Sequence, residues 1–422
     1  MTGPTVTAAP PVFVALIGQD DAVVTLTRAS VAAAAQVAKA RGDLPIVDPR
    51  SGGVPAAGAS MDPAAMTHAW LFTGPPGSGR SVAARAFAAA LQCPTGGCGA
   101  CQACRTTLGG THADVRFVVP EGLTIGVGEM RALVLRAASS PTQGRWQVLM
   151  VEDADRLTEA AGNALLKAIE EPPPRTVFLL CTPSTHPDDI SVTIRSRCRV
   201  VPLRQPPADA VAAVLRQRDG TDAETADWAA AAAQGHVGRA RRLARDPQAR
   251  ARRDAVLAVP RRLTGVGACF DAANALIDAA EAEAAAVVSD LDAGEKAALE
   301  TALGFGGTGR GAAAAARGVT GQIRDLERRQ KSRATRAQRD ALDRALVDLA
   351  GFYRDVLART FGAGVPPIHR DTADLAATAA GRWSPESTLR RLEAVLNCRA
   401  EIDANVKPRI AVEAMMLALW RG

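Results

Sequence analysis

The sequence has no run of roughly 18 or more apolar residues, so it predicts no membrane-spanning helix. Its start lacks a basic stretch followed by an apolar core, which is the pattern of a secretory signal peptide. We therefore expect a cytoplasmic protein. In that reducing compartment the eight cysteines are expected to be metal ligands or free thiols rather than disulfide partners.

Aromatic residues are also scarce, at 4% of the chain, whereas alanine and arginine are abundant. This composition favours Ala-rich helices. Hydrophobic residues make up 47% of the 422 residues, which is ordinary for a globular protein, and the length predicts about two to four domains. The formal net charge of +6 is compatible with an anionic partner such as nucleic acid, but charge alone does not identify one.

Two segments have the composition of irregular structure. Residues 1–11 are rich in proline, alanine and threonine, and we expect them to be disordered. Residues 41–66 are rich in glycine and proline without any periodicity, which predicts a long surface insertion. Between them, residues 31–38 belong to an apolar-periodic helix.

From residue 68 onward, short apolar strands alternate with helical segments. Strands are predicted at 70–73, 114–119, 147–151 and 176–181, and helices at 81–91, 127–139 and 159–171. This alternation indicates a parallel sheet that is covered by helices on both faces. Strands are not expected after residue 203. A small helical unit is predicted at 206–255 and an all-helical domain at 258–422, interrupted by a Gly-rich turn at 304–311.

A glycine-rich stretch follows the first predicted strand. Its residues are Gly74, Pro75, Pro76, Gly77, Ser78, Gly79, Arg80 and Ser81. A G-x-x-x-x-G-K-[ST] loop between a strand and a helix binds phosphates with backbone N–H groups, while its lysine neutralises the β- and γ-phosphates and its hydroxyl holds Mg²⁺. Ser81 can supply the hydroxyl, but Arg80 stands in place of the lysine.

Arginine is not equivalent to lysine in such a loop, because it is longer, planar and forked. A misplaced charge-assisted hydrogen bond weakens nucleotide binding by about one to two orders of magnitude. The loss for hydrolysis is expected to be larger, since charge develops on the γ-phosphate in the transition state. The sequence therefore favours a site without productive hydrolysis, while residual nucleotide binding and a working ATPase remain open.

The acidic pair Glu152 and Asp153, which follows the third predicted strand, is a second altered feature. A working ATPase site of this kind uses Asp for Mg²⁺ followed by Glu to orient water, so the order here is reversed. Glu is longer than Asp by one methylene, so the reversed order would shift both the metal ion and the attacking water from their working positions. The simpler interpretation is that the pair is a solvated strand end.

Four cysteines, Cys93, Cys98, Cys101 and Cys104, form a C-x4-C-x2-C-x2-C cluster among glycines. This spacing suits tetrahedral Zn²⁺, because the short turns present neighbouring thiolates to one ion. An iron–sulfur cluster also uses closely spaced cysteines, but no proline follows the last one and no redox-partner motif is present, so we favour zinc. Four thiolates leave no open coordination position, which predicts a structural metal. The other cysteines, expected to be core or free thiols, are Cys181, Cys198, Cys269 and Cys398.

Several longer motifs resemble one known family. Residues 68–75 (HAWLFTGP) are similar to the strand that enters the phosphate loop in bacterial clamp-loader subunits, and residues 163–173 (NALLKAIEEPP) closely resemble their signature helix. Residues 193–198 (TIRSRC) match their Ser-Arg-Cys motif, and a four-cysteine zinc module after the loop helix is another shared feature. Over about residues 12–250, the chain therefore resembles the AAA+ clamp-loader subunits of bacterial DNA polymerase III.

The resemblance implies an α/β AAA+ P-loop core with a parallel sheet at 12–203, a small helical lid at 204–257 and an all-α collar or oligomerisation domain at 258–422. It also implies a hetero-oligomeric loader, with gamma/tau and delta subunits as partners, that places a sliding clamp on primed DNA. Loss of the loop lysine points to the delta-prime branch of the family. An active ATPase subunit of the gamma/tau type is the alternative.

Three further positions gain a role only through the resemblance. Arg197 matches the arginine that reaches the ATP of a neighbouring subunit and stabilises transition-state charge in trans. The simpler interpretation is that Arg197 is one of several exposed arginines, near Arg195 and Arg199, without a special role. Thr182 matches the approximate position of a sensor residue at a strand end. Gly238 stands where active members carry a sensor arginine, with Arg239 one residue later, which again suggests a weakened nucleotide site.

Two basic stretches, 239–253 and 324–339, have no assigned role. Such runs are usually solvated helix faces, and DNA contact is the alternative interpretation. The segment 304–340 is also longer than the family resemblance leads us to expect. If the basic stretches and the cysteine cluster were contiguous, the chain could instead be a zinc-dependent nucleic-acid-binding module without nucleotide chemistry.

Overall fold

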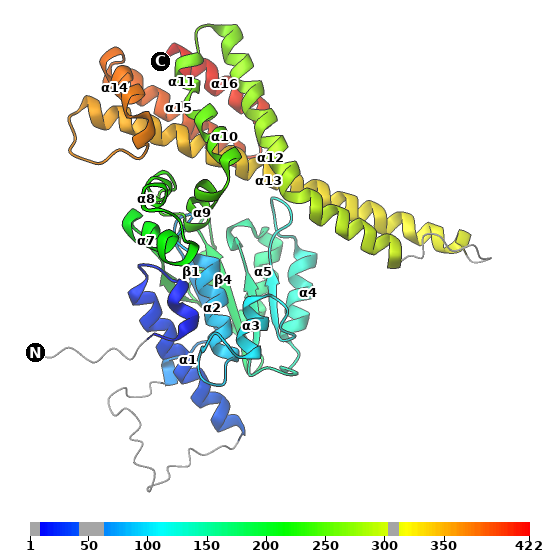
Figure 1. Ribbon diagram of the computed structural model, residues 1–422. Helices are drawn as coiled ribbons and strands as arrows, with labels where there is room; N and C mark the ends of the chain where they lie inside the picture. Colours follow the sequence, from blue (N-terminus) through cyan, green and yellow to red (C-terminus); the bar gives the residue numbers. More distant parts are fainter. Residues whose placement is uncertain (1–8, 42–62, 303–311) are drawn as a thin grey trace, which may run out of the picture. The chain divides into compact units, whose positions relative to one another are not determined.

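The computed structural model describes residues 9–41, 63–302 and 312–422 and divides the chain into two compact units (Figure 1). The first unit comprises Met1–Pro120, Thr124–Arg218 and Gly235–Gly238, and the second comprises Glu121–Leu123, Asp219–Gln234 and Arg239–Gly422. The predicted disordered N-terminus, the surface insertion and the Gly-rich turn lie wholly or mostly outside the described residues.

The first unit alternates strands with helices, as the sequence predicts. Its strands are β1 (Ala69–Thr73), β2 (Val115–Val118), β3 (Gln147–Val151), β4 (Thr176–Thr182) and β5 (Arg199–Pro202). Its α-helices are α1 (Asp20–Arg41), α2 (Arg80–Gln92), α3 (Gln102–Leu108), α4 (Val127–Ala137), α5 (Glu159–Glu170), α6 (Val192–Arg195) and α7 (Ala208–Asp219). Short 3-10 helices lie at η1 (Pro11–Ala15), η2 (Pro63–Ala65) and η3 (Ala154–Arg156).

The five strands form one parallel sheet in the order β2-β3-β4-β1-β5. Successive residues of a strand point to opposite faces, so Trp70 packs in an apolar cluster with α1 and α2, whereas Leu71 packs in another with α4 and α5. Every residue of β1, β3 and β4 is buried. The predicted α/β core, a parallel sheet with helices on both faces, is confirmed.

The sequence prediction missed β5, which pairs with β1 at the edge of the sheet. Only Val201 of its four residues is fully buried, and the strand ends in Pro202. With one buried position in four residues, β5 lacks the alternation of apolar and polar residues by which a strand is predicted. Its structure is therefore decided by pairing with β1.

Helix α5 shows how the local sequence sets the ends of an element. The Thr158 hydroxyl accepts a hydrogen bond from the Ala161 N–H at 3.3 Å and so caps the first turn. Leu165 and Ile169 lie one turn apart and are both fully buried against the sheet. The helix ends at Glu170, two residues before the prolines at 172–174.

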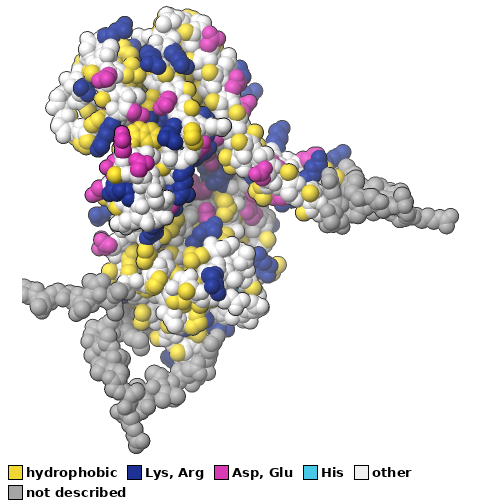
Figure 2. Space-filling view, viewed as in Figure 1, with side chains coloured by type: hydrophobic (Ala, Val, Ile, Leu, Met, Phe, Trp, Pro, Cys, Tyr) yellow, Lys and Arg dark blue, Asp and Glu magenta, His cyan; other side chains and the backbone are white. Residues whose placement is uncertain are grey.

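The second unit is helical throughout its described residues, as predicted. Its elements are α8 (Ala223–Ala232), α9 (Val237–Arg245), α10 (Pro247–Leu257), α11 (Val259–Arg262), α12 (Val266–Ala302), α13 (Ala312–Thr360), η4 (Arg370–Thr372), α14 (Ala373–Arg382), α15 (Pro385–Asp403) and α16 (Pro408–Arg421). One apolar core, which includes Phe352, Tyr353 and Met416, joins α12, α13, α15 and α16. On the visible face of this unit, basic and acidic side chains are interspersed (Figure 2). The division into lid and collar stays a prediction.

A buried carboxylate organises the loop that leads into β3. Asp114 is 2% exposed, and its two oxygens accept hydrogen bonds from the backbone N–H groups of Thr142, Gln143 and Gly144 and from the Thr142 hydroxyl. Burial alone would raise the pKa of Asp114, but these bonds to the charged form hold the pKa below its ordinary value.

We expect Asp114→Ala to lower the free energy of unfolding at pH 7 by about 3 kcal/mol, because four donors lose their acceptor. The folded-state pKa is depressed, so the stabilisation is present above the unfolded pKa of about 4 and is lost as the pH falls through the folded value. Denaturant unfolding of both proteins at pH 7 and below pH 4 measures this. A difference that stays constant with pH would contradict the electrostatic account.

Candidate nucleotide site and cysteine cluster

The glycine-rich loop connects the carboxyl end of β1 to the first turn of α2. Two of its glycines are required by close contacts. A Cβ on Gly74 would lie 2.3 Å from the Leu203 carbonyl oxygen, and a Cβ on Gly77 would lie 2.8 Å from the Cβ of His236. Gly77 also has a φ of 88°, in the left-handed region that favours glycine. The predicted tight strand–helix turn is therefore present.

Arg80 folds back over this loop. One guanidinium nitrogen donates a hydrogen bond to the Gly74 carbonyl oxygen at 2.5 Å, and another lies 3.9 Å from a carboxylate oxygen of Asp153. Its side chain is only 14% exposed. The arginine that replaces the loop lysine is thus engaged by the loop backbone and by one of the two acidic residues after β3.

The other acidic residue is paired as well. Glu152 accepts hydrogen bonds from Arg85 of α2 at 2.8 Å and 3.2 Å, and the Arg85 guanidinium also lies 4.3 Å from the centre of the Phe117 ring. Arg85 lies outside every motif of the sequence, 67 residues from Glu152, so no local pattern predicts this pairing. Both carboxylates at the predicted metal and water positions therefore face arginines, which compete with a cation for the same oxygens.

Side chains from distant segments brace the loop. The hydroxyl of Thr182, the predicted sensor residue, is buried and donates to the Ser184 carbonyl at 2.8 Å, so this hydrogen bond does not involve the loop. Two glutamines do contact the loop: Gln19 donates to the Ser78 carbonyl at 3.3 Å, and Gln205 donates to the Pro76 carbonyl at 3.1 Å. The sequence motif could not reveal these two contacts because both glutamines lie outside it.

Arg197 lies at the other end of the sheet. The strands are parallel, and Arg197 precedes β5, whose first residue pairs with Trp70 of β1, whereas the glycine-rich loop follows Thr73. The length of β1, about 10 Å between Trp70 and Thr73, separates the two ends. Arg197 is 39% exposed and forms an ion pair with Glu170 at 2.7 Å. This position is remote from the chain's own loop, and the guanidinium is partly exposed.

The arginine next to the predicted lid sensor position has a partner of its own. Arg239 forms a buried ion pair with Asp348 of α13, within the second unit. The side chains are 11% and 5% exposed, respectively. Gly238, at the sensor position itself, has no side chain to contribute.

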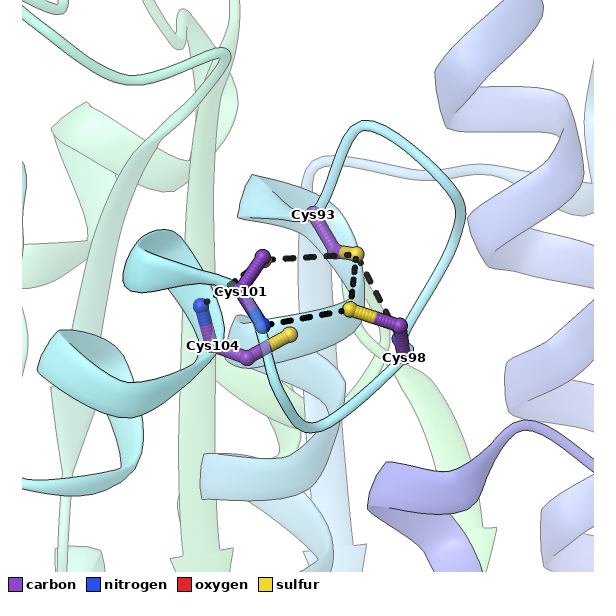
Figure 3. A group of neighbouring side chains, drawn as sticks. All are labelled: Cys93, Cys98, Cys101 and Cys104. Atoms are coloured by element: carbon purple, nitrogen blue, oxygen red, sulfur yellow. Dashed lines mark hydrogen bonds between the residues drawn. The ribbon is translucent and has the colours of Figure 1, made fainter.

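The four clustered cysteines converge in space (Figure 3). All four sulfur atoms lie within 4.8 Å of one another, and the Sγ of Cys93 lies 3.7 Å from that of Cys98 and 3.8 Å from that of Cys101. A tetrahedron of thiolates with Zn–S distances of about 2.3 Å places the sulfur atoms about 3.8 Å apart. The donor set and its spacing therefore fit one tetrahedral metal ion.

Backbone N–H groups support the thiolate forms. The amides of Cys98, Cys101 and Cys104 each lie 3.4 Å from the sulfur of the preceding cysteine in the cluster. Burial opposes ionisation of Cys93, but the Thr95 hydroxyl and backbone N–H groups lower the pKa of Cys93 to about 6. Backbone hydrogen bonds likewise lower the pKa of Cys98, whereas burial raises that of Cys104.

The remaining cysteines do not join this cluster. Burial raises the pKa of all four, and three of them are fully enclosed in the apolar cores. They are Cys181, Cys198, Cys269 and Cys398.

Comparison with known proteins supports the family resemblance. Residues 58–207 match the family described as "DNA polymerase III, delta subunit". The delta-prime subunit of DNA polymerase III from Escherichia coli K12 is 39% identical over 146 residues, which are 33% of this chain and 43% of that protein. The Bacillus subtilis delta-prime subunit is 32% identical over 148 residues, covering 34% and 44% of the two chains. The gamma/tau subunit of Mycobacterium tuberculosis H37Rv is 35% identical over 161 residues, covering 37% and 28%.

The chain spans less than half the length of these relatives. The family match at 58–207 falls on the α/β core, so this part of the chain carries the similarity to clamp-loader subunits. Delta-prime and gamma/tau subunits match at similar identity, so the comparisons do not separate the two branches. None of the described helices combines the length and apolar character that a bilayer-spanning helix needs.

Proposed function

We propose that this chain is a cytoplasmic delta-prime-type subunit of the DNA polymerase III clamp loader, which helps gamma/tau and delta subunits place the sliding clamp on primed DNA. Similarity to clamp-loader subunits over the AAA+ core supports a place in that complex. One observation favours the delta-prime branch. Arg80 and Arg85 are paired with Asp153 and Glu152, the two carboxylates that an ATPase of this type needs for metal and water.

The pairing explains why the chain's own nucleotide site would be degenerate. A bound triphosphate needs a compact cation at position 80 and a carboxylate free to hold Mg²⁺. Here the Arg80 guanidinium is hydrogen-bonded to the loop carbonyl of Gly74, and Arg85 competes with any metal for Glu152. Binding Mg²⁺ and nucleotide would require both arginines to leave their partners.

Arg197 would act on a neighbouring subunit. Its position at the amino end of the sheet, away from the chain's own loop, suits an arginine supplied in trans. Such an arginine stabilises the charge that develops on the transferred phosphoryl group. Glu170, at the end of α5, would hold the guanidinium in place until the neighbour's nucleotide replaces it.

The cysteine cluster would hold one structural Zn²⁺. Cys93 caps the end of α2, and Cys101 caps the start of α3. A metal bound by these residues, together with Cys98 and Cys104, would cross-link the two helices and supply no open position for chemistry.

An active gamma/tau-type ATPase is the second candidate. It is favoured by the retained glycines of the loop and by Ser81, which stands where the metal-binding hydroxyl is needed. In that case Arg80 would have to take over the role of the lysine.

We expect the purified chain to show no ATP turnover and weak ATP binding, and Arg80→Lys to raise ATP affinity by about tenfold or more. The lysine would restore the compact charge and release the pairing with Asp153. Calorimetric ATP titration and steady-state phosphate release measure both properties, with exposed Arg28→Lys as the matched control. Sustained turnover by the unmodified chain would replace our proposal with the gamma/tau-type ATPase.

In a loader reconstituted with gamma/tau and delta subunits, Arg197→Ala is expected to reduce clamp loading and ATP turnover at the site it completes by at least about tenfold. Assembly, measured by gel filtration, should be unchanged because the side chain is partly exposed. Arg195→Ala removes a neighbouring exposed arginine and serves as the control. Equal turnover in the wild-type and Arg197→Ala complexes would exclude the trans role.

Metal analysis of the purified chain is expected to find one zinc ion per molecule. Cys101→Ser should release the ion and lower Tm by more than about 5 °C, since the cross-link between α2 and α3 is lost. Cys198→Ser, which changes a thiol outside the cluster, should leave zinc content unchanged. A stable, metal-free wild-type protein would end the zinc assignment, and iron in place of zinc would indicate an iron–sulfur cluster.

A further inference from the structure

The two basic stretches of the chain differ in how their charges are used. In the first, on α9 and α10, arginines are paired with acids of the second unit. These pairs are Arg239–Asp348, Arg241–Asp219, Arg242–Glu283, Arg245–Asp219, Arg252–Glu283 and Arg253–Asp371. Intramolecular ion pairs thus neutralise most of the arginines in this stretch, which leaves little positive charge for a partner.

The second stretch lies on α13, which packs along α12 as a two-helix arm (Figure 1). The face of α13 toward α12 is formed by buried Leu326, by Gln330, which donates to the Asp292 carbonyl, and by Arg333, which pairs with Asp292 and Glu295. Arg333 also lies 3.6 Å from a carboxylate oxygen of Glu121, so three carboxylates surround its guanidinium.

The opposite face of α13 carries a row of cations. Arg324, Arg328 and Lys331 follow one another at spacings of four and three residues, which places them on one side of the helix, over about 10 Å of its length. All three are exposed. Basic side chains are visible on the arm in Figure 2. We call Arg324, Arg328 and Lys331 the outer row.

The outer row has little intramolecular compensation. Within the described part of the chain, Arg324 and Lys331 form no ion pair, and Arg328 pairs only with Asp325 of its own helix at 3.3 Å. The two side chains of that pair are 80% and 70% exposed, a setting in which an ion pair contributes little. Exposed Glu327, three residues after Arg324 and four before Lys331, lowers the net charge of this stretch, but among the described residues no ion pair joins it to either cation. The three cations of the row therefore remain exposed to an anionic partner.

The composition of the arm selects the class of partner. Residues 271–351 contain one aromatic residue, Phe305, so the arm has no platform for stacking unpaired bases. Among the described residues of α13 from 321 to 341, no large apolar side chain is exposed, so the row lacks the apolar centre of a protein–protein interface. Guanidinium and ammonium groups in a straight row suit a regularly spaced phosphate backbone.

We propose that the outer row of α13 binds the phosphodiester backbone of duplex DNA without reading its sequence. The inference extends the proposed function, in which the loader acts on primed DNA, and gives a role to the long segment that the family resemblance left unassigned. Each phosphate that the row neutralises would release counterions from the DNA, so binding should weaken steeply with salt.

The test measures binding of the full-length chain to a fluorescent duplex by anisotropy at several salt concentrations. Replacing all three outer-row residues by alanine (R324A/R328A/K331A) should weaken binding at low salt by about tenfold or more. It should also reduce the slope of log affinity against log salt by about 3, at about 0.9 per phosphate contact. The matched control R359A/R382A/R421A removes three exposed arginines of the same unit and should retain the wild-type slope.

Three results would overturn the inference: no duplex binding by the wild-type chain, equal losses in both triple variants, or unchanged DNA binding by the outer-row variant. In the last case, loss of gel-filtration coelution with the other loader subunits would assign the row to an acidic protein surface instead. The binding assay uses this chain alone and so does not depend on a loader complex. If the outer-row variant shows the expected change in salt dependence but the chain does not join a loader, DNA binding by the row is supported and only the proposed function is contradicted.

Discussion

The parallel direction of all five strands is the constraint on which the functional geometry depends. Parallel strands bring all their carboxyl ends to one end of the sheet, so the glycine-rich loop after β1 and the acidic pair after β3 must lie together. For the same reason, every segment that leads into a strand enters the sheet at its opposite end, where the amino ends of the strands lie. Arg197, which lies just before β5, is therefore remote from its own loop.

Pairing of arginines with carboxylates decides which charges remain available. Arg80 and Arg85 are paired with the two acidic residues after β3, and arginines of α9 and α10 are paired with acids within the helical unit. A guanidinium that is already hydrogen-bonded to a carboxylate offers little to a phosphate. The net charge of +6 is thus a poor guide to binding. The informative quantity is the set of cations left without such partners.

The cysteine cluster depends on different physics from the nucleotide site. Its four sulfur atoms are supplied by twelve consecutive residues, and turns at Gly96, Gly97 and Gly99, all with φ in the left-handed region, bring them together. More distant residues only support this loop, since the Val12 N–H donates to the Gly97 carbonyl and Arg145 donates to the Cys93 carbonyl. The loop at 74–81 accepts hydrogen bonds from Gln19 and Gln205, which lie far away in the chain, so its conformation depends on how these segments pack against it.

The sequence by itself determined the features that local chain geometry governs. Glycines at 74, 77 and 79 specify the turn, cysteine spacing specifies the cluster, and uninterrupted apolar runs specify the buried strands β1, β3 and β4. Each of these patterns involves residues that are close together in the sequence. Tertiary structure alone decided the edge strand β5, which has a single buried position, and the pairing of Arg85 with Glu152, whose members are 67 residues apart. It also decided which basic residues face acids and which face solvent. No local pattern encodes those choices, because the packing of distant helices brings the partners together.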